Sequence, residues 1–205
     1  MNKSKNALST ALAAILLAAS LFAVAAPQPS NAAVASTSPS SSKMLLYISP
    51  QEYNNSVLLR TRYYQYWFEQ GPKVEALARK KFGAEFGEVA MCEGTNEANT
   101  IVWLKPSMFY NPVARSYFGR IVAEVYSGNG KSLATYTGKV QHPGSIDINT
   151  VREINTTYNI ALNDVVRQMA ADQNFKKVLD IPPDSAQIPC ANIALYSPKK
   201  SISFY

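Results

Sequence analysis

The spacing of hydrophobic positions changes along the chain, and each change marks a new element. The run KMLLYIS at 43–49 is apolar and stops at Pro50, which predicts a short buried strand. The stretch SVLLRTRYYQYWF at 56–68 alternates weakly between apolar and polar positions, which favours a further extended segment. The domain is therefore predicted to begin with strands.

Two stretches have the three- and four-residue spacing of an amphipathic helix. The first follows Gly71 and Pro72 and covers 73–86, with apolar positions at Val74, Leu77, Ala78 and Phe82. The second begins after a cap at Asp147 or Asn149, and its apolar positions are Val151, Ile154, Tyr158, Leu162, Val165 and Met169. We expect Phe175, Val178 and Leu179 to continue its contact with a sheet.

Between these helices the hydrophobic period is two. The runs EVAMC at 88–92 and TIVWLKPSMFY at 100–110 are rich in strand-forming residues. RSYFGRIVAEVYS at 115–127 and KSLATYTGKVQ at 131–141 follow them on either side of a Gly-Asn-Gly turn. This arrangement predicts a β-hairpin.

The turn also contains Gly-Lys-Ser, the end of a phosphate-binding loop. Such a loop needs a further glycine five positions earlier and a helix after the lysine. Val125 stands at that earlier position, and a strand pattern follows Lys131. We expect no nucleotide site here, and we expect Asn129 and Gly130 to supply the positive φ of a tight turn.

Together the elements predict an α/β (α+β) domain over 43–181. Its architecture is a single mixed, largely antiparallel sheet with two amphipathic helices packed on one face. Residues 182–205 contain several prolines and no clear periodicity, so they are expected to form an irregular C-terminal tail.

Residues 1–32 have the layout of a secretory signal peptide. Lys3 and Lys5 precede a long apolar run, and small residues suit cleavage after Ala25 or Ala32. The alternative is an uncleaved membrane anchor, for which the apolar run is of marginal length. Residues 33–42 are Ser, Pro, Ala, Thr and Val without charge, which predicts a disordered linker.

Charge gives little support to a nucleic-acid partner. Without Lys3 and Lys5 of the leader, 18 basic residues face 14 acidic ones, a net charge of +4. The basic residues occur in pairs and triplets such as 79–81, 176–177 and 199–200, which are typical of solvated faces. We predict no nucleic acid, no nucleotide, no cofactor and at most peripheral membrane contact.

Both cysteines, Cys92 and Cys190, lie after the leader. In an oxidising compartment we expect them to form a disulfide that attaches the tail to the domain. The alternative is two unpaired thiols.

No catalytic constellation stands out. His142 is the single histidine, which excludes a multi-histidine metal site, and we expect it to end a strand before a turn. A secreted hydrolase would have to use His142, with Ser145 or an unplaced acid, although Ser145 has no Gly-x-Ser-x-Gly context. We therefore predict that the protein is not an enzyme.

Aromatic residues are concentrated in YYQYWF at 63–68, with others further along the chain. Some must fill the core, and the remainder could form a groove for a peptide, glycan or acyl chain. The candidates for such a binding surface are Tyr64, Tyr66, Trp67 and Tyr110.

The order of elements resembles that of small envelope proteins of Gram-negative bacteria. The resemblance covers 44–179 and rests on the leader, the helix-to-strand segment GPKVEALARKKFGAEFGEV, the hairpin RIVAEVYSGNGKSLATY and the closing helix. The group includes YajG-like lipoproteins, auxiliary lipoproteins of ABC transport and the lipopolysaccharide-assembly lipoprotein. The segment 17–20 reads Leu-Ala-Ala-Ser, which is like the signal box of bacterial lipoproteins except at its last position. Ser20 stands there in place of the lipid-bearing cysteine, so this chain departs from the family at that residue.

The resemblance implies a periplasmic accessory protein that supports transport or outer-membrane assembly by binding an envelope protein, lipid or glycan. Strand addition at an exposed sheet edge is one physical route to such binding. The alternatives are the hydrolase with His142 and a secreted effector or surface factor.

Overall fold

The computed structural model describes residues 42–94, 96, 98–181, 190 and 193. The expected leader, most of the expected linker and most of the expected tail lie outside these residues. The elements, in chain order, are β1 (Met44–Tyr47), α1 (Pro50–Tyr53), β2 (Ser56–Arg60), β3 (Gln65–Glu69), α2 (Gln70–Phe86), β4 (Val89–Met91), β5 (Thr100–Asn111), β6 (Ser116–Ser127), β7 (Ser132–Pro143), α3 (Thr150–Ala171) and α4 (Gln173–Leu179).

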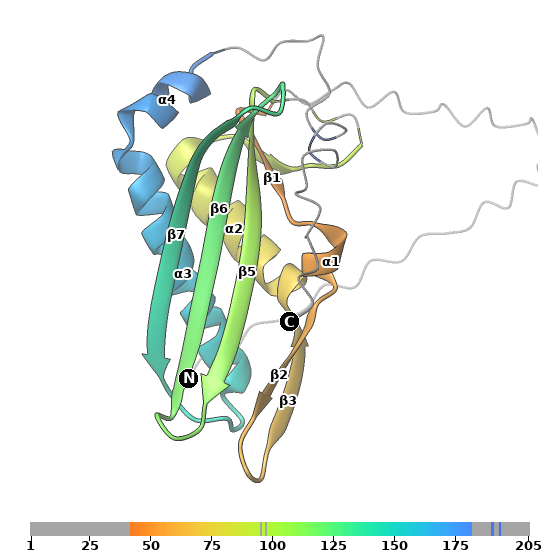
Figure 1. Ribbon diagram of the computed structural model, residues 1–205, viewed down its shortest axis with the longest axis vertical. Helices are drawn as coiled ribbons and strands as arrows, with labels where there is room; N and C mark the ends of the chain where they lie inside the picture. Colours follow the sequence, from red (N-terminus) through yellow and green to blue (C-terminus); the bar gives the residue numbers. More distant parts are fainter. Residues whose placement is uncertain (1–41, 95, 97, 182–189, 191–192, 194–205) are drawn as a thin grey trace, which may run out of the picture. The chain divides into compact units, whose positions relative to one another are not determined.

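The main sheet has five strands in the order β4-β1-β5-β6-β7 (Figure 1). The short, fully apolar β1 runs parallel to both of its neighbours, β4 and β5. The three long strands β5, β6 and β7 form an antiparallel meander, as their period-two pattern predicts. The predicted mixed, largely antiparallel sheet is confirmed.

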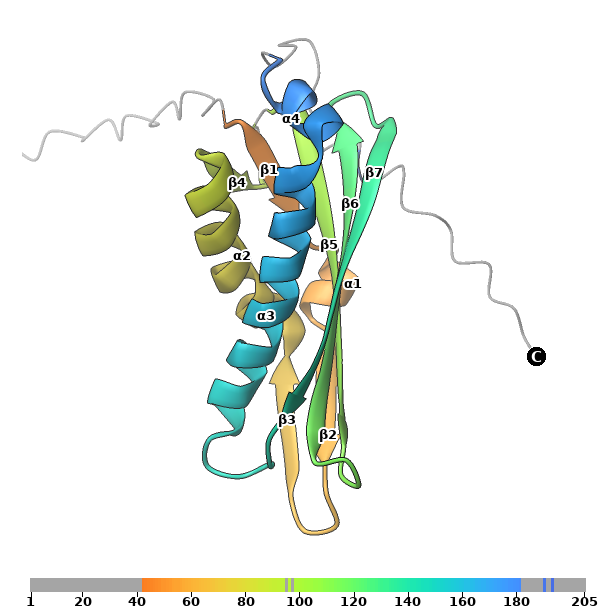
Figure 2. The ribbon, with the colours of Figure 1, turned by 90° about the vertical axis from the view of Figure 1, so that its left-hand side faces the viewer.

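Helices α2 and α3 cover one face of this sheet, which confirms the predicted arrangement (Figures 1 and 2). The predicted positions Val74, Ala78 and Phe82 of α2 are buried. The buried predicted positions of α3 are Ile154, Tyr158, Leu162, Val165 and Met169.

Val151 does not belong to this buried face. It was expected at the start of the apolar stripe, but its side chain is 40% exposed. Asn149 occupies the N-cap position without a side-chain capping bond, and Asp147 instead accepts a hydrogen bond from the Asn149 N–H at 2.7 Å. Val151 therefore lies outside the buried face of α3, although its neighbour Thr150 is buried.

The apolar stripe of α3 continues into a separate helix. Asp172 accepts hydrogen bonds from the N–H groups of Asn174 and Phe175, which makes it the N-cap of α4. Phe175 is buried against the core, as expected, but the chain bends at Asp172 to place it there.

A buried hydrogen bond joins the two long helices. The Tyr158 hydroxyl of α3 donates to the side-chain oxygen of Gln70, the first residue of α2, at 2.8 Å. Both side chains are buried, and this burial raises the pKa of Tyr158 above its ordinary value. The bond satisfies two polar groups that would otherwise be costly inside the core.

The segment 56–68 forms an element that the single-sheet prediction lacked. Strands β2 and β3 pair only with each other within the described residues, as a separate two-stranded sheet. The expected extended structure is confirmed, but its place in one continuous sheet is wrong. The buried side chains of Leu59 and Phe68 attach this hairpin to the core, where the Phe68 ring meets Tyr158 edge-on at 6.4 Å.

The turn between β6 and β7 is the predicted hairpin turn. The Gly130 N–H donates to the Ser127 carbonyl at 2.8 Å, and Gly130 takes a φ of 79°. Of the two residues expected to supply positive φ, Gly130 does so and Asn129 does not. Strand β6 precedes the turn and strand β7 follows it, so the helix that a phosphate-binding loop requires is not present at this point.

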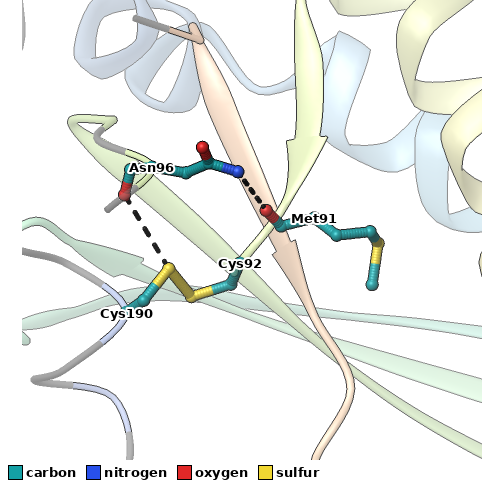
Figure 3. The surroundings of a disulfide bond; sticks show 4 residues. All are labelled: Met91, Cys92, Asn96 and Cys190. Atoms are coloured by element: carbon teal, nitrogen blue, oxygen red, sulfur yellow. Dashed lines mark hydrogen bonds between the residues drawn. A yellow bond between two sulfur atoms is a disulfide. The ribbon is translucent and has the colours of Figure 1, made fainter. Parts of the chain in front are cut away.

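The expected disulfide between Cys92 and Cys190 is present, with Cα atoms 5.4 Å apart (Figure 3). Cys190 Sγ lies 3.9 Å from the Asn96 carbonyl oxygen, a contact without a proton because the sulfur is oxidised. Asn96 in turn donates to the Met91 carbonyl at 3.0 Å. Near the bond, Ile193 is buried with Leu45, Ala98, Ile101 and Trp103 in a second, smaller apolar cluster.

Candidate functional site

The β2–β3 hairpin exposes several large aromatic side chains. Tyr63 is 80% exposed, Tyr64 61% and Trp67 60%. With the exposed Arg60 and Arg62 they make up what we call the aromatic hairpin surface. Large aromatic groups are costly to leave in water, and their clustering on one element points to a contact surface.

Strand alternation explains which side chains of the hairpin are exposed. Leu59 pairs with Tyr66 and Val57 with Phe68 on the inner face, which packs on the core. The outer face carries the pair Leu58 and Trp67. Because successive strand residues point to opposite faces, burial of Phe68 requires Trp67 to point outward.

The tip of the hairpin is closed by its own hydrogen bonds. The Thr61 N–H donates to the Tyr64 carbonyl at 2.8 Å. The Thr61 hydroxyl accepts from the N–H groups of Tyr63 and Tyr64, at 3.3 and 3.0 Å. These bonds pair the N–H groups of Thr61, Tyr63 and Tyr64 and the carbonyl of Tyr64, and so fix the turn that carries the two exposed tyrosines.

The hairpin is basic. Segment 56–68 contains two arginines and no acidic residue. Arg62 places its guanidinium 5.7 Å from the centre of the Tyr63 ring, within cation–π range. Within the part of the chain that the structure describes, neither Arg60 nor Arg62 forms an ion pair. Both charges are available to an anionic partner.

The four predicted surface residues fall into two groups. Tyr64 and Trp67 are exposed on the hairpin. Tyr66 is half-buried and packs against Phe68, and Tyr110 is half-buried on β5, where its hydroxyl donates to the Gly144 carbonyl at 3.1 Å. Tyr66 and Tyr110 therefore contribute to packing.

Sequence reasoning missed Tyr63 and the two arginines as members of this surface. Tyr63 precedes the strand and lies in the turn that Thr61 closes. A signal was available, since a threonine between two short alternating runs can close a turn by bonding its hydroxyl to the backbone two residues on, and Tyr63 is that residue.

A second aromatic pair, of which Phe109 is exposed and Phe118 half-buried, lies on the sheet face opposite the helices. Phe109 of β5 stacks on Phe118 of β6, with ring centres 4.7 Å apart and planes within 2° of parallel. Arg120 and Lys139 lie beside them around an open hollow of about 510 Å³. Here the aromatic rings mainly contact each other, whereas the hairpin aromatics point to solvent.

The β7 edge of the sheet is partly blocked against strand addition. The Gln168 side chain of α3 donates to the Thr137 carbonyl at 2.9 Å, so one backbone group of this edge is already occupied. Lys139 is exposed on the same strand, and charged residues on edge strands discourage pairing with another chain. This edge is a weaker candidate than the hairpin.

His142 ends β7, as predicted, and is held by a carboxylate. Its Nε2 lies 2.7 Å from Glu153 on α3. The Ser145 hydroxyl instead accepts a hydrogen bond from Arg115 at 2.9 Å. Within the described residues His142 thus has an acid partner, and its pairing with Ser145 is not formed.

Two further findings concern the described residues alone. No group of three or more His, Cys, Asp or Glu side chains comes together there in a way that could hold a metal ion. No helix in that part of the chain has the length and hydropathy of a membrane span.

Comparison with known proteins gives little. No protein-family model matches the chain, and no curated protein matches it. A crystal structure at 2.40 Å of a Caulobacter crescentus CB15 protein, provisionally described as a lipoprotein, is similar over 67% of this chain and 90% of that one. The TM-score is 0.35 and the sequence identity 9%, a level of likeness that does not bear on function.

Proposed function

We propose that this protein is an exported, non-enzymatic accessory protein of the bacterial cell envelope, and that it acts by binding. The aromatic hairpin surface is the observation on which the proposal depends. Tyr, Trp and Arg are the residues enriched at the centres of protein contact surfaces, and here they gather on one element anchored in the core. A rigid anchor lowers the entropy lost when such side chains bind.

Export is supported by two features. The leader pattern of residues 1–32 is that of a secretory signal, and the Cys92–Cys190 disulfide suits an oxidising compartment. The periplasm is the proposed location, with release from the cell as the alternative. Support of transport or outer-membrane assembly is the role that the resemblance to envelope lipoproteins suggests.

Site-specific crosslinking in intact cells tests the proposal. A photoreactive amino acid is placed at Tyr64 in one strain and at Val113, which is 93% exposed in the turn after β5, in another. Mass spectrometry of the adducts, with fractionation of periplasm and medium, should find one envelope component enriched at position 64 and not at 113. Equal, nonspecific adducts at both positions would contradict the proposal.

The hydrolase alternative has a separate test. His142→Ala removes the ring that contacts Glu153, and an activity lost in that variant with its fold intact would favour catalysis. We expect no such activity in a screen of ester, amide and glycoside substrates.

A further inference from the structure

We infer that the aromatic hairpin surface is a membrane-surface anchor: Tyr63, Tyr64 and Trp67 enter the headgroup layer of an anionic bilayer, and Arg60 and Arg62 bind lipid phosphates. The inference rests on the proposed function and names the partner of the same surface. It concerns shallow, reversible contact from one side of the membrane.

The side chains have the required chemistry. Tyr and Trp rings combine an apolar body with a polar group, and they concentrate at the level of lipid headgroups for this reason. Three such rings are more than half exposed at the tip and on the outer strand face. Transfer into the headgroup region would remove their apolar area from water while their polar ends stay hydrated.

The charges of the hairpin complement an anionic surface. Arg60 and Arg62 are exposed, and no acidic residue lies between Ser56 and Phe68. The nearest acid along β3 is Glu69, which pairs with Ser56 at the opposite end of the hairpin. Glu69 lies four positions after Gln65, which places it about 14 Å along the strand from the tip end of β3.

The form of the hairpin favours a lipid surface over a protein partner. Its turn reaches beyond the ends of β5 and β6 in both views (Figures 1 and 2). A hollow does lie beside Trp67, but Glu69, Pro72 and Lys73 line it at the base of the hairpin. A convex tip without a groove needs no complementary pocket, and a headgroup layer offers none.

Several backbone groups of the tip are already hydrogen-bonded within the turn. Thr61 pairs with the carbonyl of Tyr64 and with the N–H groups of Tyr63 and Tyr64. Unpaired backbone groups are costly at a membrane, so this turn, with three N–H groups and one carbonyl already paired, can enter the headgroup layer at lower cost than an open loop. We expect a depth of about 5–10 Å, as for other interfacial elements.

Vesicle binding tests the inference. The exported protein is mixed with vesicles of phosphatidylethanolamine and phosphatidylglycerol, or of phosphatidylcholine alone, and binding is measured by sedimentation and tryptophan fluorescence. Trp67 should shift to shorter wavelength on anionic vesicles, while Trp103, only 3% exposed, should not change. Binding should weaken as salt is raised, because salt screens the arginine contacts.

Variants locate the binding. Removing both arginines with Arg60→Ala and Arg62→Ala should weaken partition about 30-fold, since each basic residue near an anionic surface contributes about fivefold. Replacing Tyr63, Tyr64 and Trp67 by Ser should abolish it. The matched control carries Arg120→Ala and Lys139→Ala, which remove two basic residues from the face of the main sheet opposite the helices. It should bind vesicles as the unchanged protein does. An uncleaved leader would bind all variants alike, so it cannot produce this difference.

The outcomes separate this inference from the proposed function. Equal binding to both vesicle types, or an equal loss in the Arg120 and Lys139 control, overturns the lipid inference. If position 64 still crosslinks one envelope protein in that case, the proposed function stands with a protein partner. If the hairpin neither binds anionic vesicles nor crosslinks to an envelope protein at position 64, both the lipid inference and the proposed function are overturned.

Discussion

Glu153 is held by contacts from two directions. Nε2 of His142 lies 2.7 Å from one carboxylate oxygen, and the Arg152 guanidinium donates to the other at 2.9 Å. The contact with His142, followed by that with Arg152, lowers the pKa of Glu153 below its ordinary value of 4.5. The pair connects the end of β7 to the first turn of α3.

This pKa shift predicts a pH dependence of stability. The folded state prefers the ionised carboxylate, so the contribution is present above about pH 5 and is lost as the pH falls through the lowered pKa. Glu153→Gln should reduce the free energy of unfolding by about 1 kcal/mol at pH 6. The difference from the unchanged protein should shrink toward pH 3, as measured by urea unfolding across this range.

Glu85→Gln is the matched control, because Glu85 is exposed on α2. Its unfolding curves should follow those of the unchanged protein at each pH. A Glu153→Gln deficit that is the same at pH 6 and pH 3 would contradict the assigned cause.

At the scale of elements, the contact between α3 and the sheet depends on two glycines. A Cβ at Gly138 of β7 would lie 2.0 Å from the Ala161 carbonyl oxygen. A Cβ at Gly119 of β6 would lie 2.6 Å from the methyl group of Thr157. The helix can approach these strands closely because neither residue has a side chain.

Gly138→Ala should therefore separate α3 from β7. The added methyl group meets backbone, which cannot move aside as a side chain would, so we expect a loss of about 3 kcal/mol or more. Gly83→Ala is the contrasting variant, since nothing lies within 4 Å of its Cβ position on α2. It should gain about 0.5–1 kcal/mol through helix propensity. Thermal unfolding of both variants checks the prediction, and a neutral Gly138→Ala would contradict the packing described.

The sequence predicted the long elements because their periodicity persists over many residues. β5 to β7 and the buried face of α3 are examples. It did not separate β2–β3 from the main sheet, because a short alternating run looks the same in either position and strand pairing is set by distant residues. The members of the aromatic hairpin surface were only partly predicted for a related reason. A shift of β3 by one residue would turn Trp67 toward the core and Tyr66 toward solvent. The contact of buried Phe68 with Tyr158, which lies far away in the sequence, determines which of the two arrangements forms.

At the scale of the whole molecule, the Cys92–Cys190 disulfide links strand β4's end to a residue 98 positions later. Strands β5 to β7 and helices α3 and α4 lie between the two cysteines, whereas β1 to β4, α1 and α2 precede Cys92. Crosslinks across long loops act mainly by limiting the unfolded chain.

Replacing both cysteines by alanine should lower the free energy of unfolding by about 4.7 kcal/mol, the value that chain entropy gives for a loop of this length. The midpoint of urea unfolding measures the loss, and reductant added to the unchanged protein should produce a matching decrease. Midpoints that stay the same in both experiments would show that the bond does not support the fold.

The same bond also sets an order of events in biogenesis. A chain that emerges N-terminus first presents Cys92 well before Cys190, about 5–20 s earlier at ordinary rates of synthesis. In the oxidising compartment that we propose, Cys92 has no intramolecular partner during that interval and is open to thiol exchange with an oxidoreductase. Closure to Cys190 can come only after β5, β6, β7 and α3 have been synthesised, so oxidation of this pair reports that these elements are complete.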